Sequence, residues 1–151
     1  MEINKQNSKA ISYCKFKNTN CLEPYLSQKN LNQKHKIAIS CFRLSNHSLM
    51  IEKGRHAKPR KIERNERFCH FCKNIVEDEK HFLTSCPLYT PARGKLERVC
   101  ASNCALYESL NADQRFIFIL SNENPLIIKH LGKFVTESMI IREKIIEYFF
   151  T

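Results

Sequence analysis

The feature that most constrains the fold of this chain is a closely spaced set of three cysteines and one histidine. The pattern Cys-x2-Cys-x8-His-x4-Cys is formed by Cys69, Cys72, His81 and Cys86. Thiolate sulfur and imidazole nitrogen are the usual ligands of tetrahedral zinc, and a Cys-x2-Cys knuckle is a common way to supply two of them. Four protein ligands leave no position for a substrate or an activated water. The pattern therefore predicts a closed zinc site that stabilises a fold and does not catalyse.

A second interpretation is that these are four unrelated residues, some of them buried thiols. The short spacings argue against it, as do the apolar residues between the ligands, which are Phe68, Phe71, Phe82 and Leu83. Cys100 and Cys104 share one helix face, but no second pair accompanies them, so we interpret them as small buried residues.

The composition favours an intracellular protein, nuclear or cytoplasmic. A length of 151 residues suits one domain or one modest core with extensions. The longest compact apolar run, residues 116–120, is far short of the roughly 18 residues that cross a bilayer. The N-terminal residues are polar and lack a signal-peptide core. In a reducing compartment, eight cysteines favour metal ligands and free thiols over the alternative, a disulfide framework.

Positive charge is concentrated on the segment that leads into the predicted zinc site. Residues 29–73 hold twelve Lys or Arg against three Glu, a net charge of +9, whereas residues 74–151 have a net charge of −1. Such a tract is often only a solvated surface or a localisation signal. Next to a zinc knuckle it favours contact with nucleic-acid phosphates. The candidate contacts are Lys53, Arg55, Lys58, Arg60, Lys61, Arg64, Arg67, His70 and Lys73.

Two further patterns near the ligands have ordinary explanations. His70 lies between the knuckle cysteines, where side chains point outward, so we expect an exposed ring; stacking on a base is the functional alternative. The run Glu77-Asp78-Glu79 could suggest a carboxylate or magnesium site. We interpret it as a charged helix start, with Asp78 as the N-cap, because no nucleophile or base accompanies it.

The fold class predicted from the sequence is mostly α, with a small zinc-knuckle hairpin and a short helix packed against a helical C-terminal part. Helical spacing begins near Leu31 and ends near residues 45–46, and another such pattern runs from Leu96 to Tyr107. Asn111 with Gln114 resembles a capping box. A last helix is expected to start at Asn124-Pro125, with a stripe of Ile128, Leu131, Val135, Ser138, Arg142, Ile145 and Phe149.

The expected organisation has four parts. They are a loosely ordered lead-in (1–30), a helix and basic loop (31–67), a zinc-binding module (68–90) and a helical tail (91–151) that forms one domain with the module.

The region around the ligands also resembles a known family. The resemblance is carried by LSNHSLMIEKGRH (residues 44–56), RFCHFC (67–72), VEDEKHFLTSCPLY (76–89) and Arg93. It is to the zinc-binding region at the C-terminal end of LINE-type (non-LTR) retrotransposon reverse transcriptases. In that family a Cys-Cys-His-Cys motif follows the polymerase domain, and it is implied to engage element RNA or target DNA. The resemblance covers about residues 35–95.

The correspondence supports binding and not catalysis. The four candidate ligands match the family's ligands one for one, and the flanking pattern is matched by residues 77–79, Phe82-Leu83, Pro87 and Tyr89. The chain has no polymerase aspartate pair and no endonuclease residues, so the resemblance implies a detached tail.

We therefore expect a non-catalytic, zinc-stabilised module that binds RNA or DNA and uses neither a membrane nor a small-molecule substrate. One alternative is a protein-interaction module or homodimer, formed through a helical face of Ile127, Leu131, Phe134, Ile141, Ile145 and Tyr148. The other is a folded element relic without a selected function.

Overall fold

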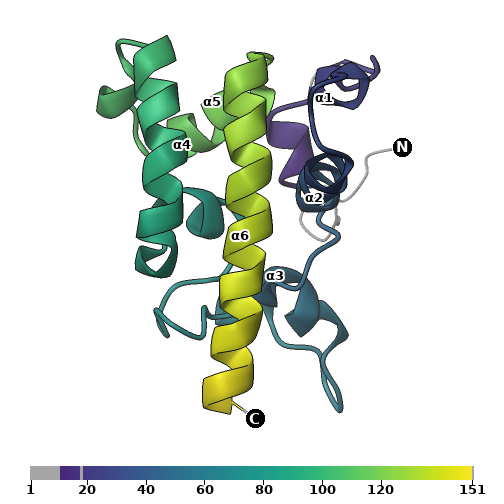
Figure 1. The fold of residues 1–151 in the computed structure, drawn as a ribbon. Coiled ribbons are helices and arrows are strands. Elements are labelled where there is room, and N and C mark those ends of the chain that lie inside the picture. Colours follow the sequence, from purple (N-terminus) through teal and green to yellow (C-terminus); the bar gives the residue numbers. More distant parts are fainter. Residues whose placement is uncertain (1–10, 18, 151) are drawn as a thin grey trace.

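The computed structural model describes residues 11–17 and 19–150, and this part of the chain is mostly α-helical (Figure 1). The α-helices, in chain order, are α1 (Pro24–Ser27), α2 (Gln33–Arg43), α3 (Met50–Lys53), α4 (Thr90–Asn103), α5 (Ala112–Ser121) and α6 (Pro125–Phe150). Within the described residues, the β-structure consists of one antiparallel bridge between Phe68 and Val76. The fold class predicted from the sequence is thus confirmed. None of the helices in the described segments combines the length and apolar character needed to cross a membrane.

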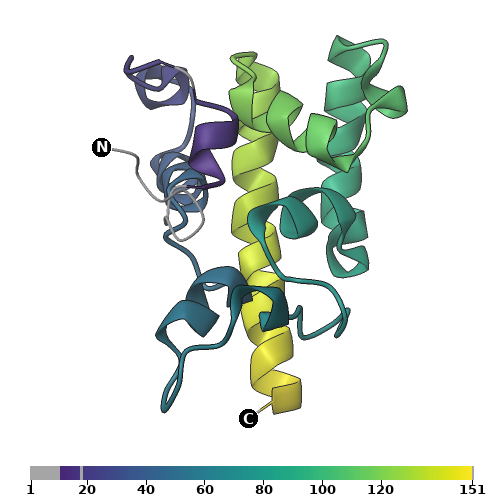
Figure 2. The same cartoon turned by 180° about the vertical axis from the view of Figure 1, so that it is seen from behind.

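Helix α6 is the axis of the molecule, with α2 along one side and α4 along the other (Figure 1). Its buried apolar stripe includes Ile127, Leu131, Phe134 and Val135. Seen from behind, the segment that carries the four candidate ligands lies across α6 (Figure 2). The stripe therefore contributes to the core along the N-terminal half of α6, and the ligand segment lies against the C-terminal half of the helix.

Local capping signals explain why the main helices start where they do. The Asn32 side chain accepts a hydrogen bond from the backbone N–H of Lys34 at 2.8 Å and opens α2. Asn111 and Gln114 exchange reciprocal bonds of 2.9 Å, which is the predicted capping box at the start of α5. Helix α6 begins at Pro125, as the Asn-Pro pair predicts. The starts of α5 and α6 are confirmed, and α2 begins two residues after Leu31, where helical spacing sets in.

The helix after the ligand segment ends earlier than its spacing predicts. Helix α4 stops at Asn103, because the chain turns into an extended conformation at Cys104. Tyr107 lies in a separate 3-10 turn, η7 (Tyr107–Ser109), and its ring packs on Phe118 at 5.5 Å between centroids. The apolar spacing that continued to Tyr107 reflects burial on the same core and not a continuous helix.

Residues 11–17 and 19–30, which belong to the expected lead-in, contact the core, and its first ten residues and residue 18 lie outside the described part. Phe16 and Tyr25 are buried in the core. Between them lies the guanidinium of Arg43, whose carbon is 4.5 Å from the centroid of the Phe16 ring. Arg43 also donates to the carbonyl of Leu120 at the end of α5. The contacts of Arg43 with these two rings help to hold this polar segment on the core.

Glu23 balances the charge of this N-terminal layer. It pairs with Arg43 and Lys17, each at 2.9 Å, and accepts a hydrogen bond from the Tyr13 hydroxyl at 2.9 Å. Burial opposes its ionisation, but the hydrogen bonds from Lys17 and Tyr13 and the charge of Arg43 hold the pKa of Glu23 below its usual value.

Candidate metal centre

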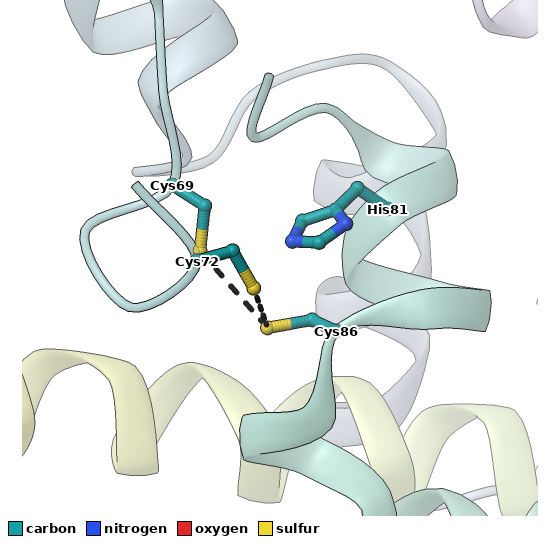
Figure 3. Close-up of side chains that lie close together, drawn as sticks. All are labelled: Cys69, Cys72, His81 and Cys86. Carbon is teal, nitrogen blue, oxygen red and sulfur yellow. Dashed lines mark hydrogen bonds between the residues drawn. The ribbon is translucent and has the colours of Figure 1, made fainter. Parts of the chain in front are cut away.

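The structure brings the four predicted ligands together at one point (Figure 3). The Sγ atom of Cys86 lies 4.0 Å from that of Cys69 and 3.9 Å from that of Cys72. All four candidate ligand atoms, including one from His81, lie within 4.8 Å of one another. A tetrahedral zinc ion with Zn–S bonds of about 2.3 Å would separate its sulfurs by about 3.8 Å. The observed spacing therefore fits a shared ion, and it is far longer than the roughly 2 Å of a disulfide.

The histidine supports the same interpretation. His81 is buried, and its Nε2 atom has no hydrogen-bond partner within the described residues. Its ring is directed toward the three sulfurs (Figure 3). A buried polar atom without a partner costs about 1–3 kcal/mol, which coordination to a metal would remove. The four residues could hold a metal ion such as zinc.

Ionisation of all three thiols in this space is opposed by burial and by their mutual repulsion. The hydrogen bond from Cys86 lowers the pKa of Cys69 to about 3. The same bond, together with burial, raises the pKa of Cys86 well above its usual value. Burial and the charge of Cys69 raise the pKa of Cys72. One thiolate is thus favoured and the next two are opposed, and a divalent cation is the group that would stabilise all three.

The knuckle is a tight turn closed by backbone hydrogen bonds. The N–H of Cys69 donates to the carbonyl of Ile75 at 2.8 Å, and the N–H of Lys73 donates to the carbonyl of Cys69 at 2.7 Å. Lys73 has a φ of 61°, which lets the chain reverse after Cys72. The predicted hairpin is present, with the Phe68–Val76 bridge at its base.

Of the other two ligands, His81 is the first residue of a single π-helical turn, η5 (His81–Ser85), and Cys86 directly follows that turn. The Asp78 carboxylate accepts a hydrogen bond from the backbone N–H of His81 at 2.8 Å, which confirms its capping role. The N–H of Cys86 closes the turn by donating to the carbonyl of His81 at 2.8 Å. This i to i+5 bond widens the helix and places His81 and Cys86 on the same side.

Arg93, on α4, fixes the far end of this turn. Its Nε atom donates to the carbonyl of Leu83 at 2.9 Å. Its Nη2 atom donates to the carbonyls of Cys86 at 2.6 Å and Phe82 at 3.3 Å. The side chain is buried, so these carbonyls have no water to replace it. Arg93 thus positions the turn that carries His81 and Cys86 without being a ligand itself. In the sequence, only the family resemblance pointed to this residue.

Glu77 does not behave as part of the charged helix start that we expected. It is buried and forms a two-point ion pair with Arg142 of α6, at 2.7 Å to Nε and 2.6 Å to Nη2. Its Oε2 atom also accepts from the backbone N–H of Met50 at 2.7 Å. One carboxylate therefore joins the end of the knuckle, α3 and the long helix.

Glu79 forms a second buried polar cluster, with the turn that follows α2. It accepts hydrogen bonds from Ser45 at 2.6 Å, from Ser12 at 2.8 Å and from Nε2 of His47 at 2.9 Å. Burial works against its charge, but the bonds to His47 and Ser45 lower the pKa of Glu79 to about 2. The segment between the knuckle and His81 is thereby tied to both α2 and α6.

The predicted nucleic-acid contacts differ in their exposure. Those exposed to solvent are Lys53, Lys58, Arg60, Lys61 and Lys73. Arg55 and Arg64 are half-buried, and Arg67 is buried. His70 is not the freely exposed ring that we expected, because it packs edge-on against Phe150 at 5.0 Å between centroids.

The sequence interpretation of Cys100 and Cys104 as small buried residues holds for Cys100, whereas Cys104 is only half-buried and lies just after the end of α4. Cys100 is buried on α4, and burial raises its pKa to about 12. Among the described residues, the four ligands form the one group of three or more His, Cys, Asp or Glu side chains that could hold a metal ion. Comparisons of the chain with models of protein families, with curated proteins and with solved structures found no match.

Proposed function

We propose that this chain is a non-catalytic nucleic-acid-binding module that is stabilised by one zinc ion, similar in role to the tail of a LINE-type reverse transcriptase. The observation that carries the proposal is the convergence of three sulfurs and one imidazole next to a basic loop. A site with four protein ligands has no position for a substrate. Its contribution is to hold the surrounding backbone in place.

The exposed cations support a polyanionic partner. The loop after α3 projects at the end of the molecule where α6 finishes, away from α4 (Figure 1). It carries Lys58, Arg60 and Lys61 in exposed positions, and Lys73 adds a further cation on the knuckle. Lysine and arginine at such positions neutralise phosphates and carry little sequence information. We therefore expect strong salt dependence and weak base preference.

The zinc part of the proposal is tested by metal content. We expect one zinc per chain by mass spectrometry of the purified protein, and its loss in Cys69→Ser or Cys86→Ser. Cys100→Ser is the matched control, because it removes a buried thiol outside the ligand group. Apparent zinc-binding free energies of about 10–16 kcal/mol in structural sites mean that chelation should unfold the chain. A metal-free protein that keeps its native circular dichroism would contradict this part.

The nucleic-acid part is tested by a salt titration. Fluorescence anisotropy with a labelled single-stranded oligonucleotide should show affinity that falls steeply with salt. Arg60→Ala combined with Lys61→Ala should reduce the slope of log K against log salt by about one for each phosphate that is no longer neutralised. Lys129→Ala with Lys133→Ala, exposed on α6, is the charge-matched control. A flat salt response, or equal reductions in both double variants, would refute the assignment.

The end of α6 supports a second candidate, a protein-interaction surface. Ile127, Leu131 and Phe134 of the predicted interaction face are buried core, but Tyr148 is 82% exposed, and Phe149 and Phe150 follow it. If this surface pairs two copies, Tyr148→Glu should convert a dimer to a monomer in analytical ultracentrifugation. A wild-type protein that is already monomeric at high concentration would remove this form of the candidate.

A further inference from the structure

The basic loop and the turn before the knuckle enclose a concave site that is built mainly from cations. The cavity has a volume of about 370 Å³, and its lining residues are Arg55, Lys61, Ile62, Glu63, Arg64 and Arg67. Four of these side chains are cationic and one is a carboxylate. This balance differs from that of an ordinary surface, where charges of both signs are interspersed. The cavity is suited to an anion.

Arg67 forms the buried part of this wall and is fixed by the backbone. Its Nε atom donates to the carbonyl of Ile62 at 2.9 Å, and its Nη1 atom donates to the carbonyl of Ile51 at 2.8 Å. The residue is only 9% exposed, yet no described residue accepts a hydrogen bond from its Nη2 atom. An arginine held by two of its nitrogens has a fixed position, so its positive charge is preorganised at the cavity wall.

The Arg67 side chain packs closely against Gly54 of this loop, where any larger residue would clash with it. A Cβ atom at Gly54 would lie 2.6 Å from Cγ of Arg67 and 2.9 Å from its Cδ. The N–H of Ile62 donates to the carbonyl of Gly54 at 2.9 Å and closes the base of the loop. Two of the cations that line the cavity, Arg55 and Lys61, are thus carried by a closed loop.

The positive charges in the cavity are only partly compensated. Burial lowers the pKa of Arg67, and the charges of Arg55 and Arg64 lower it further, while Glu52 and Glu63 offset part of this effect. Glu52 pairs with Arg55 at 3.2 Å. The guanidinium of Arg64 makes no hydrogen bond or ion pair with any residue in the described segments. An anion placed between these cations would relieve their mutual repulsion.

We infer that this cavity binds one backbone phosphate of a nucleic-acid strand, with the planar fork of Arg64 and the ammonium of Lys61 as the direct donors. Arg67 supplies fixed positive charge behind them. The inference rests on the proposed function and goes beyond it, because it assigns one phosphate to one built site. A guanidinium can offer two parallel hydrogen bonds to phosphate, whereas lysine acts as a point charge. A positive charge at residue 64 is therefore not sufficient for full phosphate affinity, which requires the two parallel N–H groups of a guanidinium.

The test compares substitutions that keep the charge. In anisotropy titrations at fixed salt with a labelled oligouridine, Arg64→Lys should bind about tenfold more weakly than the wild type. Arg98→Lys, on the exposed face of α4 outside the cavity, is the control and should bind as the wild type does. Native circular dichroism and full zinc content establish that Arg64→Lys is folded. Equal affinities for Arg64→Lys and the wild type would overturn the phosphate site and leave general nucleic-acid binding intact.

A second measurement separates the source of the phosphate. Inorganic pyrophosphate should raise the unfolding temperature of the wild type and leave that of Arg64→Gln unchanged, since a ligand stabilises only the state that binds it. The same anion should compete with the oligonucleotide. If pyrophosphate stabilises the wild type but no oligonucleotide binds, the proposed function fails, and the site is one for a free phosphate compound. If neither binds, the cavity has no anion role.

Discussion

Replacing Glu77 with glutamine should cost more stability than any other single loss of charge in the core. Its carboxylate receives two hydrogen bonds from Arg142 and one from the backbone of Met50, at 2.6–2.7 Å. The two charged side chains are 2% and 3% exposed, so the guanidinium left behind cannot return to water. The substitution nearly keeps the shape of the side chain, removes its charge and replaces one accepting oxygen with an NH2 group that faces a donor.

The magnitude follows from burial. Removing one partner of a buried ion pair costs about 3–5 kcal/mol, because an uncompensated charge remains. In a chain of this length, 1 kcal/mol changes the unfolding temperature by about 2–4 °C, so Glu77→Gln should lower it by roughly 6–20 °C. The control is Glu97→Gln, whose carboxylate lies 3.5 Å from Arg115 and is one-third exposed. There the expected cost is about 0–1 kcal/mol.

Urea unfolding with zinc present, followed by circular dichroism, measures both costs. A double variant, Glu77→Met with Arg142→Met, should recover much of the stability, because no unpaired charge remains in the core. The reasoning is refuted if Glu77→Gln costs no more than Glu97→Gln. It is also refuted if the cost of the double variant equals the sum of the costs of its two single substitutions.

Two further predictions concern packing and pH. Gly132→Ala would place a methyl group 2.6 Å from the Cβ atom of His35 on α2, and it should destabilise the fold by about 1–3 kcal/mol. Gly94→Ala, whose methyl group would have its nearest neighbour at 3.9 Å, should stabilise the fold by up to about 1 kcal/mol through helix propensity. Shifts of the unfolding temperature with the same sign in both variants would contradict this. The pKa of Glu23 lies below its usual value of about 4.3, so the stability its charge provides is complete above that pH and is lost as the pH falls below it. Glu23→Gln should therefore be less stable than the wild type at pH 7, by about 1–3 kcal/mol, and the gap should shrink in acid; a gap that does not change with pH would contradict the assignment.

The sequence predicted the local features of the fold and of the site. The four ligands are close in the chain, and their spacing alone was enough to predict that they would converge. The starts of α5 and α6 depend on a capping side chain or a proline within a few residues, so they too could be read locally.

The features that could not be predicted depend on partners far apart in the chain. Glu77 and Arg142 are 65 positions apart, and the stripe on α6 gave no reason to place a cation opposite that carboxylate. The aromatic ring of Phe16 is buried because Arg43 and the end of α5 meet it, which a polar segment does not reveal. His70 was expected to be exposed, and it is half-buried, with its ring against Phe150 at the end of α6. In each case, contacts between residues distant in the chain determine the burial of the side chain, and the local sequence pattern does not predict them.

These long-range contacts change what loss of the metal should mean for the chain. If the knuckle were an appendage, removing the ion would disorder only residues 68–90. Glu77 reaches α6 through Arg142, and Glu79 reaches the end of α2 through Ser45. Both carboxylates lie between Cys72 and His81, so they keep their buried partners only while the two ligands hold that segment in place. A displaced Glu77 would leave Arg142 charged and unpaired in the core, at a cost of several kcal/mol. If the four ligands hold an ion, we therefore expect its binding to be coupled to helix packing through these two side chains.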